Sequence, residues 1–161
     1  MTHQCHNVLL LMGNIETIAA IKQSLLLEPA STKPVLDFSL LLPPPKTLQQ
    51  VKRNHAFVQQ LKRWRTQHWS TSSNGVLTHK EETETSLQLN FSTIWSPPVK
   101  VYQALMARWP EVVCVYQYHN AKACLWGLAW QQNDQGYRHE QMSEYLKTTL
   151  FRSEEHTSEL Q

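Results

Sequence analysis

The chain has 161 residues, of which 41% are hydrophobic and 17% charged, and its formal net charge is +2. No stretch approaches the roughly 18 consecutive apolar residues of a membrane-spanning helix, the first residues lack the basic start and apolar centre of a signal peptide, and three cysteines are too few for a disulfide scaffold. These numbers exclude membrane-spanning, disulfide-rich, collagen-like and wholly disordered classes, and they predict one globular domain in a reducing compartment.

Hydrophobic periodicity predicts ten elements in the order β-α-β-α-β-β-α-β-β-α. The predicted strands lie at 7–12 and 35–38, on both sides of an acidic turn within 76–94, and at 112–118 and 123–130. The predicted helices lie at 15–27, 47–65, 97–109 and 137–151. Because the strands pair along the sequence and the helices are few, this order favours an α+β fold, an antiparallel sheet with helices packed on one face, over a Rossmann sheet.

Two short segments between these elements carry specific predictions. Residues 68–74 are polar and predict a loop, in which Trp69 is a candidate binding residue. In the segment before the third helix, Ser96 is expected to be the N-cap, with Pro97 at the first helical position. Trp95 is expected to pack beneath that helix as the apolar residue before the cap.

The last two predicted strands form a hairpin. If Tyr118 pairs with Ala123, alternation places Trp126, Leu128 and Trp130 on one face, which we expect to be the core. Tyr116 and Tyr118 then point to the opposite face.

The C-terminal residues 152–161, RSEEHTSELQ, match the in-frame translation of a common sequencing adapter. We therefore expect residues 1–151 to be the natural domain, with its own C-terminus missing, and a source in assembled environmental reads; a natural acidic tail is the alternative. Without this segment the chain has 14 basic and 10 acidic residues, a net charge of +4.

Four stretches, in this order, resemble one family. They are CHNVLLLMG at 5–13, DFSLLLPPP at 37–45, FSTIWSPP at 91–98, and Trp109-Pro110 with the hairpin after it. They are similar to the Api92-like proteins with a ferredoxin-like domain, also called the YubB-type or DUF1281 family, over residues 5–130. The resemblance implies a ferredoxin-like fold and carriage on bacterial plasmids and phages, and it supplies no catalytic residue. The family's usual Asn-Trp-Gly-Thr-Lys-Trp stretch appears here only as HWSTSS at 68–73.

The predicted second helix and its flanks are the main candidate binding surface. Residues 46–68 contain no Asp or Glu, and their six cations are Lys46, Lys52, Arg53, Lys62, Arg63 and Arg65. A nucleic acid would neutralise these charges and release its own counterions. The alternative is an ordinary solvated helix face, since basic stretches alone are weak indicators.

The tyrosines of the hairpin are a second candidate surface. In a ferredoxin-like sandwich the second sheet face is often open, and aromatic side chains on an open face stack on bases in RNA-recognition modules. Tyr116 and Tyr118 are therefore candidate binding residues, although the recognition signature of those modules is absent. High β-propensity alone is the alternative explanation.

No motif indicates a metal, a cofactor or a catalytic centre. The chain lacks CxxC, HExxH, GxGxxG, P-loop and GxSxG patterns. The predicted register places Cys114 and Cys124 on opposite sheet faces, so they cannot share a tetrahedral zinc ion.

The prediction for function is a non-enzymatic accessory binding protein of a bacterial plasmid or phage, in the cytoplasm. Its partner is expected to be nucleic acid, bound through the basic helix, or else a host protein such as a defence factor. A small enzyme with a cleft near residues 68–79, using His68 or His79 as general base, is an alternative. A structural domain of a longer product is another.

Overall fold

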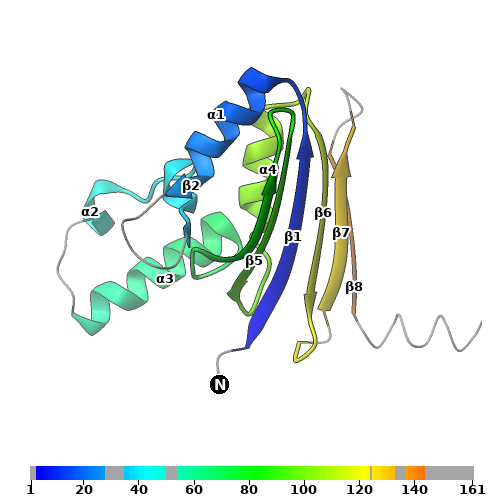
Figure 1. Ribbon diagram of the computed structural model, residues 1–161. Helices are drawn as coiled ribbons and strands as arrows, with labels where there is room; N and C mark the ends of the chain where they lie inside the picture. Colours follow the sequence, from blue (N-terminus) through cyan, green and yellow to red (C-terminus); the bar gives the residue numbers. More distant parts are fainter. Residues whose placement is uncertain (1–2, 28–34, 50–53, 124, 133–136, 144–161) are drawn as a thin grey trace, which may run out of the picture.

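The computed structural model describes residues 3–27, 35–49, 54–123, 125–132 and 137–143, which form an antiparallel sheet with helices on one face (Figure 1). The strands are β1 (Gln4–Met12), β2 (Leu26–Leu27), β3 (Val35–Leu36), β4 (Gly75–Glu82), β5 (Ser86–Ile94), β6 (Val113–Asn120), β7 (Leu125–Gln131) and β8 (Tyr137–Ser143). The helices are α1 (Ile15–Leu25), α2 (Lys46–Gln49), α3 (His55–Trp69) and α4 (Val99–Arg108), with a short 3-10 helix at Phe38–Leu40. The predicted α+β class, with helices on one sheet face, is confirmed.

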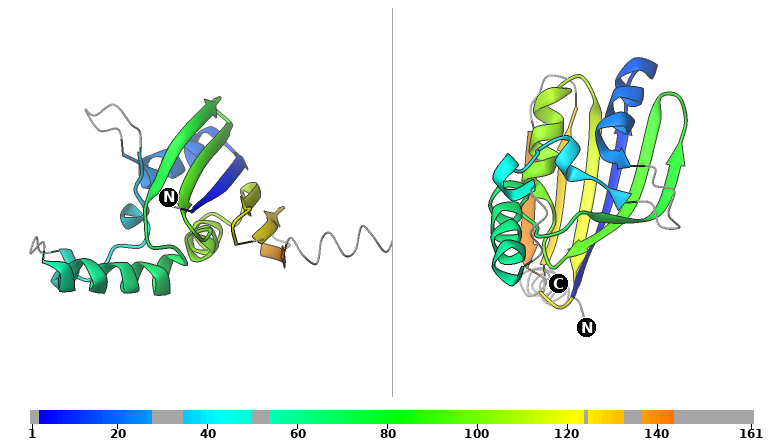
Figure 2. Two further views of the ribbon diagram at one scale, coloured as in Figure 1. Left: turned by 90° about the horizontal axis from the view of Figure 1, so that it is seen from below. Right: turned by 90° about the vertical axis from the view of Figure 1, so that its left-hand side faces the viewer.

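The sheet has the strand order β2-β3-β4-β5-β1-β6-β7-β8 among the described residues, and every neighbouring pair is antiparallel. β1 lies in the middle, with Gln4 opposite Ile94 of β5 and His6 opposite His119 of β6. The start of β1 therefore lies at the same end of the sheet as the end of β6. The views in Figure 2 show the strong twist of this sheet and the helices gathered on one side of it.

The core lies between the sheet and the two helices α1 and α4. Alternate residues of β1 and β5 are buried, as the period of two in the sequence predicts, including Leu9, Leu11, Leu87 and Leu89. The helices contribute Ile18, Ile21, Leu25, Val101, Tyr102, Leu105 and Met106, which recur at helical spacing.

The same apolar core extends to the end of α3 and anchors it. The Trp69 ring is fully buried and meets Phe38 edge-on, with 5.7 Å between ring centroids. Its indole N–H donates to the carbonyl of Leu42 at 2.9 Å. Trp69 therefore belongs to the core and ends a helix, and its assignment to a binding loop is wrong.

The predicted helix at 47–65 is two helices in the structure. α3 begins at His55 because the side chain of Asn54 caps it, accepting the N–H of Phe57 at 2.8 Å. It continues to Trp69 because that ring finds a buried site, and Ser70 then ends the helix in the left-handed conformation at φ 68°.

The predicted start of the third helix is also wrong. α4 begins at Val99, and the hydroxyl of Ser96 donates to the carbonyl of Ser70 at 2.6 Å instead of capping the helix. Trp95 has a positive φ of 67° and is 47% exposed, so it does not pack beneath α4. The Ser96 hydroxyl is therefore used in a hydrogen bond between the two loops, and no side chain caps the N-terminus of α4.

The hairpin of β6 and β7 has the predicted two faces, but the buried one is the face expected to be open. Tyr118 pairs with Gly127 and Tyr116 with Ala129, a register four residues from the predicted one. Both tyrosine rings are buried, because the small residues opposite them leave room for rings beneath the helices. Their role as an open stacking surface is therefore wrong.

The end of the chain also differs from the prediction. Residues 137–143 form β8, which pairs with β7 along its length, and not the first half of a helix. Pairing with β8 satisfies the backbone N–H and C=O groups that β7 would expose as an edge strand. The free energy of this pairing outweighs the helical spacing of the apolar residues in 137–143. The rest of the predicted helix, 144–151, lies outside the described residues.

Candidate nucleic-acid interface

The cations predicted to bind nucleic acid have different positions in the structure. Lys62 and Arg63 are exposed on α3, and Lys46 is exposed at the start of α2. Lys52 and Arg53 lie outside the described residues. Figure 1 shows α3 extending away from the sheet, so that most of its length faces solvent.

Arg65 has a structural position. It is half-buried, and its guanidinium carbon lies 5.0 Å from the centre of the Trp69 ring, a cation–π contact. Burial lowers the pKa of Arg65, and the nearby Asp37 carboxylate raises it. The assignment of Arg65 to an exposed basic surface is therefore wrong.

The C-terminal end of α3 is attached to the beginning of α4. The ammonium group of Lys100 donates to the carbonyl of Gln67, and the two loops after α3 and β5 join through Ser70 and Ser96. Gln67 lies within two helical turns of Lys62 and Arg63 on α3, so its contact with Lys100 brings the Lys100 ammonium group close to these two cations. The three cations therefore lie on or beside α3, and the loop after β5 contacts the start of β1 through the bond from the Trp95 N–H to the His3 carbonyl.

Five carboxylates lie at the opposite end of the sheet, whereas the Asp37 carboxylate lies near Arg65 of α3. Glu81, Glu82 and Glu84 lie at the β4–β5 turn, next to the end of β1, because Met12 pairs with Ser86. Glu111 accepts a hydrogen bond from Thr17 at the start of α1, and that is the same end.

Ion pairs occupy two of these carboxylates, those of Glu81 and Glu82. Glu82 lies 3.0 Å from the ammonium of Lys22 and 3.8 Å from that of Lys80. The hydrogen bond from Lys22 lowers the pKa of Glu82. Among the ion pairs between described residues, none involves Lys62 or Arg63.

We call the two ends the acidic end and the basic end. The acidic end comprises Glu16, Glu81, Glu82, Glu84 and Glu111. The basic end comprises Lys62, Arg63, Lys100, Lys122, His3, His6 and His119. This separation brings residues from four distant parts of the chain together, and the linear pattern of charges gave no indication of it.

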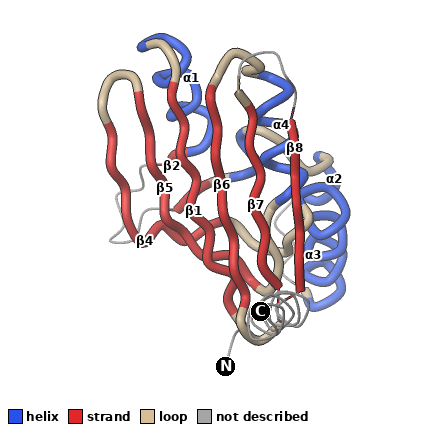
Figure 3. Tube along the Cα trace, turned by 90° about the vertical axis from the view of Figure 1, so that its right-hand side faces the viewer, coloured by secondary structure: helices blue, strands red, loops and turns tan. Residues whose placement is uncertain are grey.

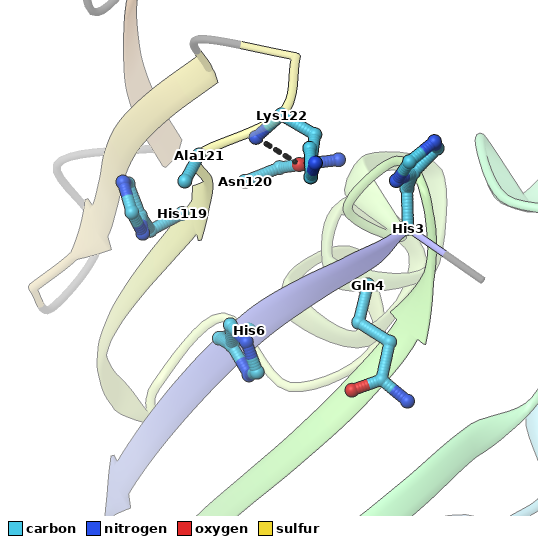
Figure 4. Close-up of a pocket in the computed structure, with 7 residues that line it drawn as sticks. All are labelled: His3, Gln4, His6, His119, Asn120, Ala121 and Lys122. Atoms are coloured by element: carbon cyan, nitrogen blue, oxygen red, sulfur yellow. Dashed lines mark hydrogen bonds between the residues drawn. The ribbon is translucent and has the colours of Figure 1, made fainter. Parts of the chain in front are cut away.

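A cavity of about 350 Å³ opens at the basic end, between the start of β1 and the β6–β7 turn (Figure 4). Its lining consists of His3, Gln4, His6, His119, Asn120, Ala121 and Lys122. Among the described residues, no group of three or more His, Cys, Asp and Glu side chains converges as metal ligands do.

The sheet face that no described helix covers is apolar in part. Figure 3 looks onto this face and shows the helices behind it. Val8, Leu10, Val115, Trp126, Leu128 and Trp130 alternate with the buried residues of β1, β6 and β7 and therefore lie on this face. Sequence analysis assigned Trp126, Leu128 and Trp130 to the core, which is wrong.

The two histidines suggested as general bases have other contacts. His68 stacks on Trp64 with 4.5 Å between ring centroids, and its Nδ1 lies 2.9 Å from the Trp64 carbonyl oxygen. His79 lies 3.1 Å from the carboxylate of Glu81. Neither residue lines the cavity at the basic end or the small apolar cavity beside Phe38.

Comparison with known proteins gives one match. A family model described as the ferredoxin-like domain in Api92-like protein matches residues 68–159, more than half of the chain. The match extends beyond Phe151, and the adapter origin of residues 152–161 stays a prediction. No curated protein and no solved structure matches the chain. None of the helices among the described residues has the length and hydrophobicity needed to span a bilayer.

Proposed function

The chain belongs to the Api92-like family with a ferredoxin-like domain, and from this premise we propose that it is a non-enzymatic accessory protein of a bacterial plasmid or phage that binds nucleic acid in the cytoplasm. The observation that carries the proposal is the separation of charge into an acidic and a basic end. A phosphate backbone attracted to exposed, unneutralised cations releases condensed counterions, which supplies most of the affinity of sequence-independent binding.

The arrangement of α3 supports this role. Lys62 and Arg63 lie on a helix that extends from the body of the protein, and the carboxylates of Glu81 and Glu82 are ion-paired at the far end. The ammonium of Lys100 and the cavity at the β6–β7 turn continue the basic surface beyond α3. A nucleic-acid strand can therefore contact several of these cations at once without approaching the described carboxylates of the acidic end.

Binding to single- and double-stranded DNA and RNA at low and high salt tests the proposal. We expect retardation at low salt that weakens steeply as salt is added. The variant Lys62→Gln/Arg63→Gln should lower affinity about tenfold or more, and the slope of log affinity against log salt should shrink by about 1.5 to 2, because two phosphate contacts are lost.

A control variant with the same change in net charge distinguishes an effect of the basic end on affinity from an effect of the net charge of the protein. Lys80→Gln/Arg108→Gln removes two positive charges near the acidic end, and we expect it to change affinity less than twofold. Equal losses in both double variants would mean that overall charge and not this surface attracts the strand. No retardation of any of the four nucleic acids at low salt would exclude the proposal.

The uncovered sheet face favours a second candidate, a host protein as partner. Met12 is 48% exposed and Val115 36% exposed on this face, and its described positions on β1, β6 and β7 carry no Asp, Glu, Lys or Arg. Exposed contiguous apolar surface is typical of protein interaction sites. A complex formed there should be stoichiometric and only weakly sensitive to salt. It should be lost in Val115→Glu and kept in Val58→Glu, a similarly exposed apolar site on α3, away from the sheet face.

A further inference from the structure

The cavity at the basic end has the chemistry of an anion site. Three imidazoles, one ammonium group and the Gln4 amide belong to residues that line about 350 Å³, and no carboxylate is among the described residues that line it. This volume is at the lower end of the range for sites that take small organic ligands. An imidazole donates an N–H to an anion whether it is neutral or protonated, and the lysine adds a permanent charge.

The sheet places the imidazoles together. His6 of β1 pairs directly with His119 of β6, so both side chains lie on the same, uncovered face of the sheet. His3 precedes β1, and Lys122 belongs to the turn that follows β6. Figure 4 shows the imidazoles and the turn arranged around the opening.

Buried hydrogen bonds hold the rim in place. Asn120 is 1% exposed; its carbonyl oxygen accepts the backbone N–H groups of Lys122 and Ala123 at 3.1 and 3.2 Å. Its amide donates to the carbonyl of Trp95, which ties the β6–β7 turn to the loop after β5. The backbone N–H of Trp95 in turn donates to the carbonyl of His3 at 2.8 Å.

An exposed aromatic ring stands beside the cavity. The Trp95 ring meets that of His3 edge-on, with 5.2 Å between centroids. Trp95 has a left-handed backbone, which costs a non-glycine residue free energy and is frequent at functional sites. The indole is 47% exposed and is available to stack on a flat ring.

We propose that this cavity binds a phosphate monoester attached to a nucleoside, with His3, His6, His119 and Lys122 around the phosphate and the Trp95 ring against the base. Two sources share this chemistry, a free nucleoside monophosphate and the phosphorylated end of a nucleic-acid strand. The second source rests on the proposed nucleic-acid binding, whereas the first does not.

Binding of a dianion in this cavity takes up protons. The charged and titratable side chains that line the cavity from β1, β6 and the β6–β7 turn are His3, His6, His119 and Lys122. Imidazole is the side chain that changes charge between about pH 5 and 8, and a phosphate stabilises its charged form. Affinity should therefore rise several-fold as the pH is lowered from about 8 to about 6, and it should not rise further below that, because the phosphate takes up its own second proton at about pH 6.

Calorimetric titration of the full chain with adenosine 5′-monophosphate, adenosine and inorganic phosphate tests the site. We expect the monophosphate to bind at least tenfold more tightly than adenosine, and more tightly near pH 6 than near pH 8. His6→Gln/Lys122→Gln should weaken this binding tenfold or more. His79→Gln/Lys80→Gln, the same two changes at the other end of the sheet, should leave it unchanged.

The strand-end source is tested with oligonucleotides that carry either a phosphate or a hydroxyl at the 5′ or 3′ end. We expect a preference for one phosphorylated end that disappears in His6→Gln/Lys122→Gln, while general retention on the basic helix persists. If the protein binds the monophosphate but retains no oligonucleotide, the proposed site in the cavity stands and the proposed nucleic-acid binding function is contradicted. No binding of the monophosphate near pH 6, or undiminished binding in His6→Gln/Lys122→Gln, would overturn the inference.

Discussion

The ring of Tyr118 lies directly against Gly127 on the neighbouring strand. The two residues are a cross-strand pair, and a Cβ atom at Gly127 would lie 2.0 Å from Cζ of Tyr118. The absence of a side chain at Gly127 therefore makes room for a buried ring next to the sheet. This relationship explains why the tyrosine face and not the tryptophan face of the hairpin is covered by helices.

Gly127→Ala should destabilise the protein by about 2–3 kcal/mol, because the new methyl group forces the buried ring out of place. Urea denaturation measures the change. Gly13→Ala is the control, since the nearest side-chain atom there is 3.4 Å from the added Cβ, an ordinary contact, and we expect a change within about 0.5 kcal/mol. Equal stabilities of the two variants would contradict the packing of Tyr118 on Gly127.

Asn7 is a buried polar residue whose side chain links three elements. Its amide donates to the carbonyl of Cys5 at 3.1 Å and to the hydroxyl of Thr93 at 3.2 Å, and its oxygen accepts the hydroxyl of Tyr102 at 3.3 Å. Asn7→Ala should cost about 2–4 kcal/mol, because it removes these bonds inside the core. Asn90→Ala, on the uncovered side of β5, should cost less than about 1 kcal/mol. Thermal and urea unfolding of both variants distinguish these outcomes.

The buried thiols of Cys5 and Cys114 predict a loss of stability at alkaline pH. Burial raises the pKa of Cys114 to about 12 and that of Cys5 to about 11. In the unfolded chain these thiols ionise near pH 9.0. The folded state therefore keeps protons that the unfolded state loses, and the free energy of unfolding falls as the pH rises above that value.

The expected loss from the two thiols between about pH 8 and pH 10 is on the order of 2–3 kcal/mol. The experiment compares the pH dependence of unfolding in the wild type and in Cys5→Ala/Cys114→Ala, which should lack this part of the slope. Both thiols should also resist thiol reagents until denaturant is added. An identical slope in the double variant would show that other groups cause the alkaline loss.

Arg65 is a cation with a structural role, and a variant of it distinguishes that role from nucleic-acid binding. Its Nε atom is buried without a hydrogen-bond partner among the described residues, and its guanidinium rests on Trp69. Arg65→Met keeps the apolar contact and removes the unsatisfied atom, so we expect the free energy of unfolding to change by less than about 1 kcal/mol. Nucleic-acid affinity and its salt slope should stay close to wild type. A loss as large as that of Lys62→Gln/Arg63→Gln would place Arg65 in the interface.

The boundaries of α3 show what a local sequence pattern predicts and what it does not. The apolar and basic spacing of 47–65 correctly indicated helix, but the end of α3 depends on a burial site for Trp69 that Phe38, Leu42 and Arg65 build. Likewise, β8 follows from the open edge of β7 and not from the helical spacing of residues 137–143. In both places long-range contacts outweigh the local pattern.

Hydrophobic periodicity along the chain was sufficient to predict the strands β1 and β3 to β7, the helices α1 and α4, and the division of β6 and β7 side chains into two faces. The resemblance over four stretches was sufficient for the family. Which face the helices cover was decided by packing in three dimensions, because a period of two defines two faces and does not say which of them is buried. The same packing brought His3, His6, His119 and Lys122 around one cavity and separated the charges into two ends, since register between distant strands has no local signature in the chain.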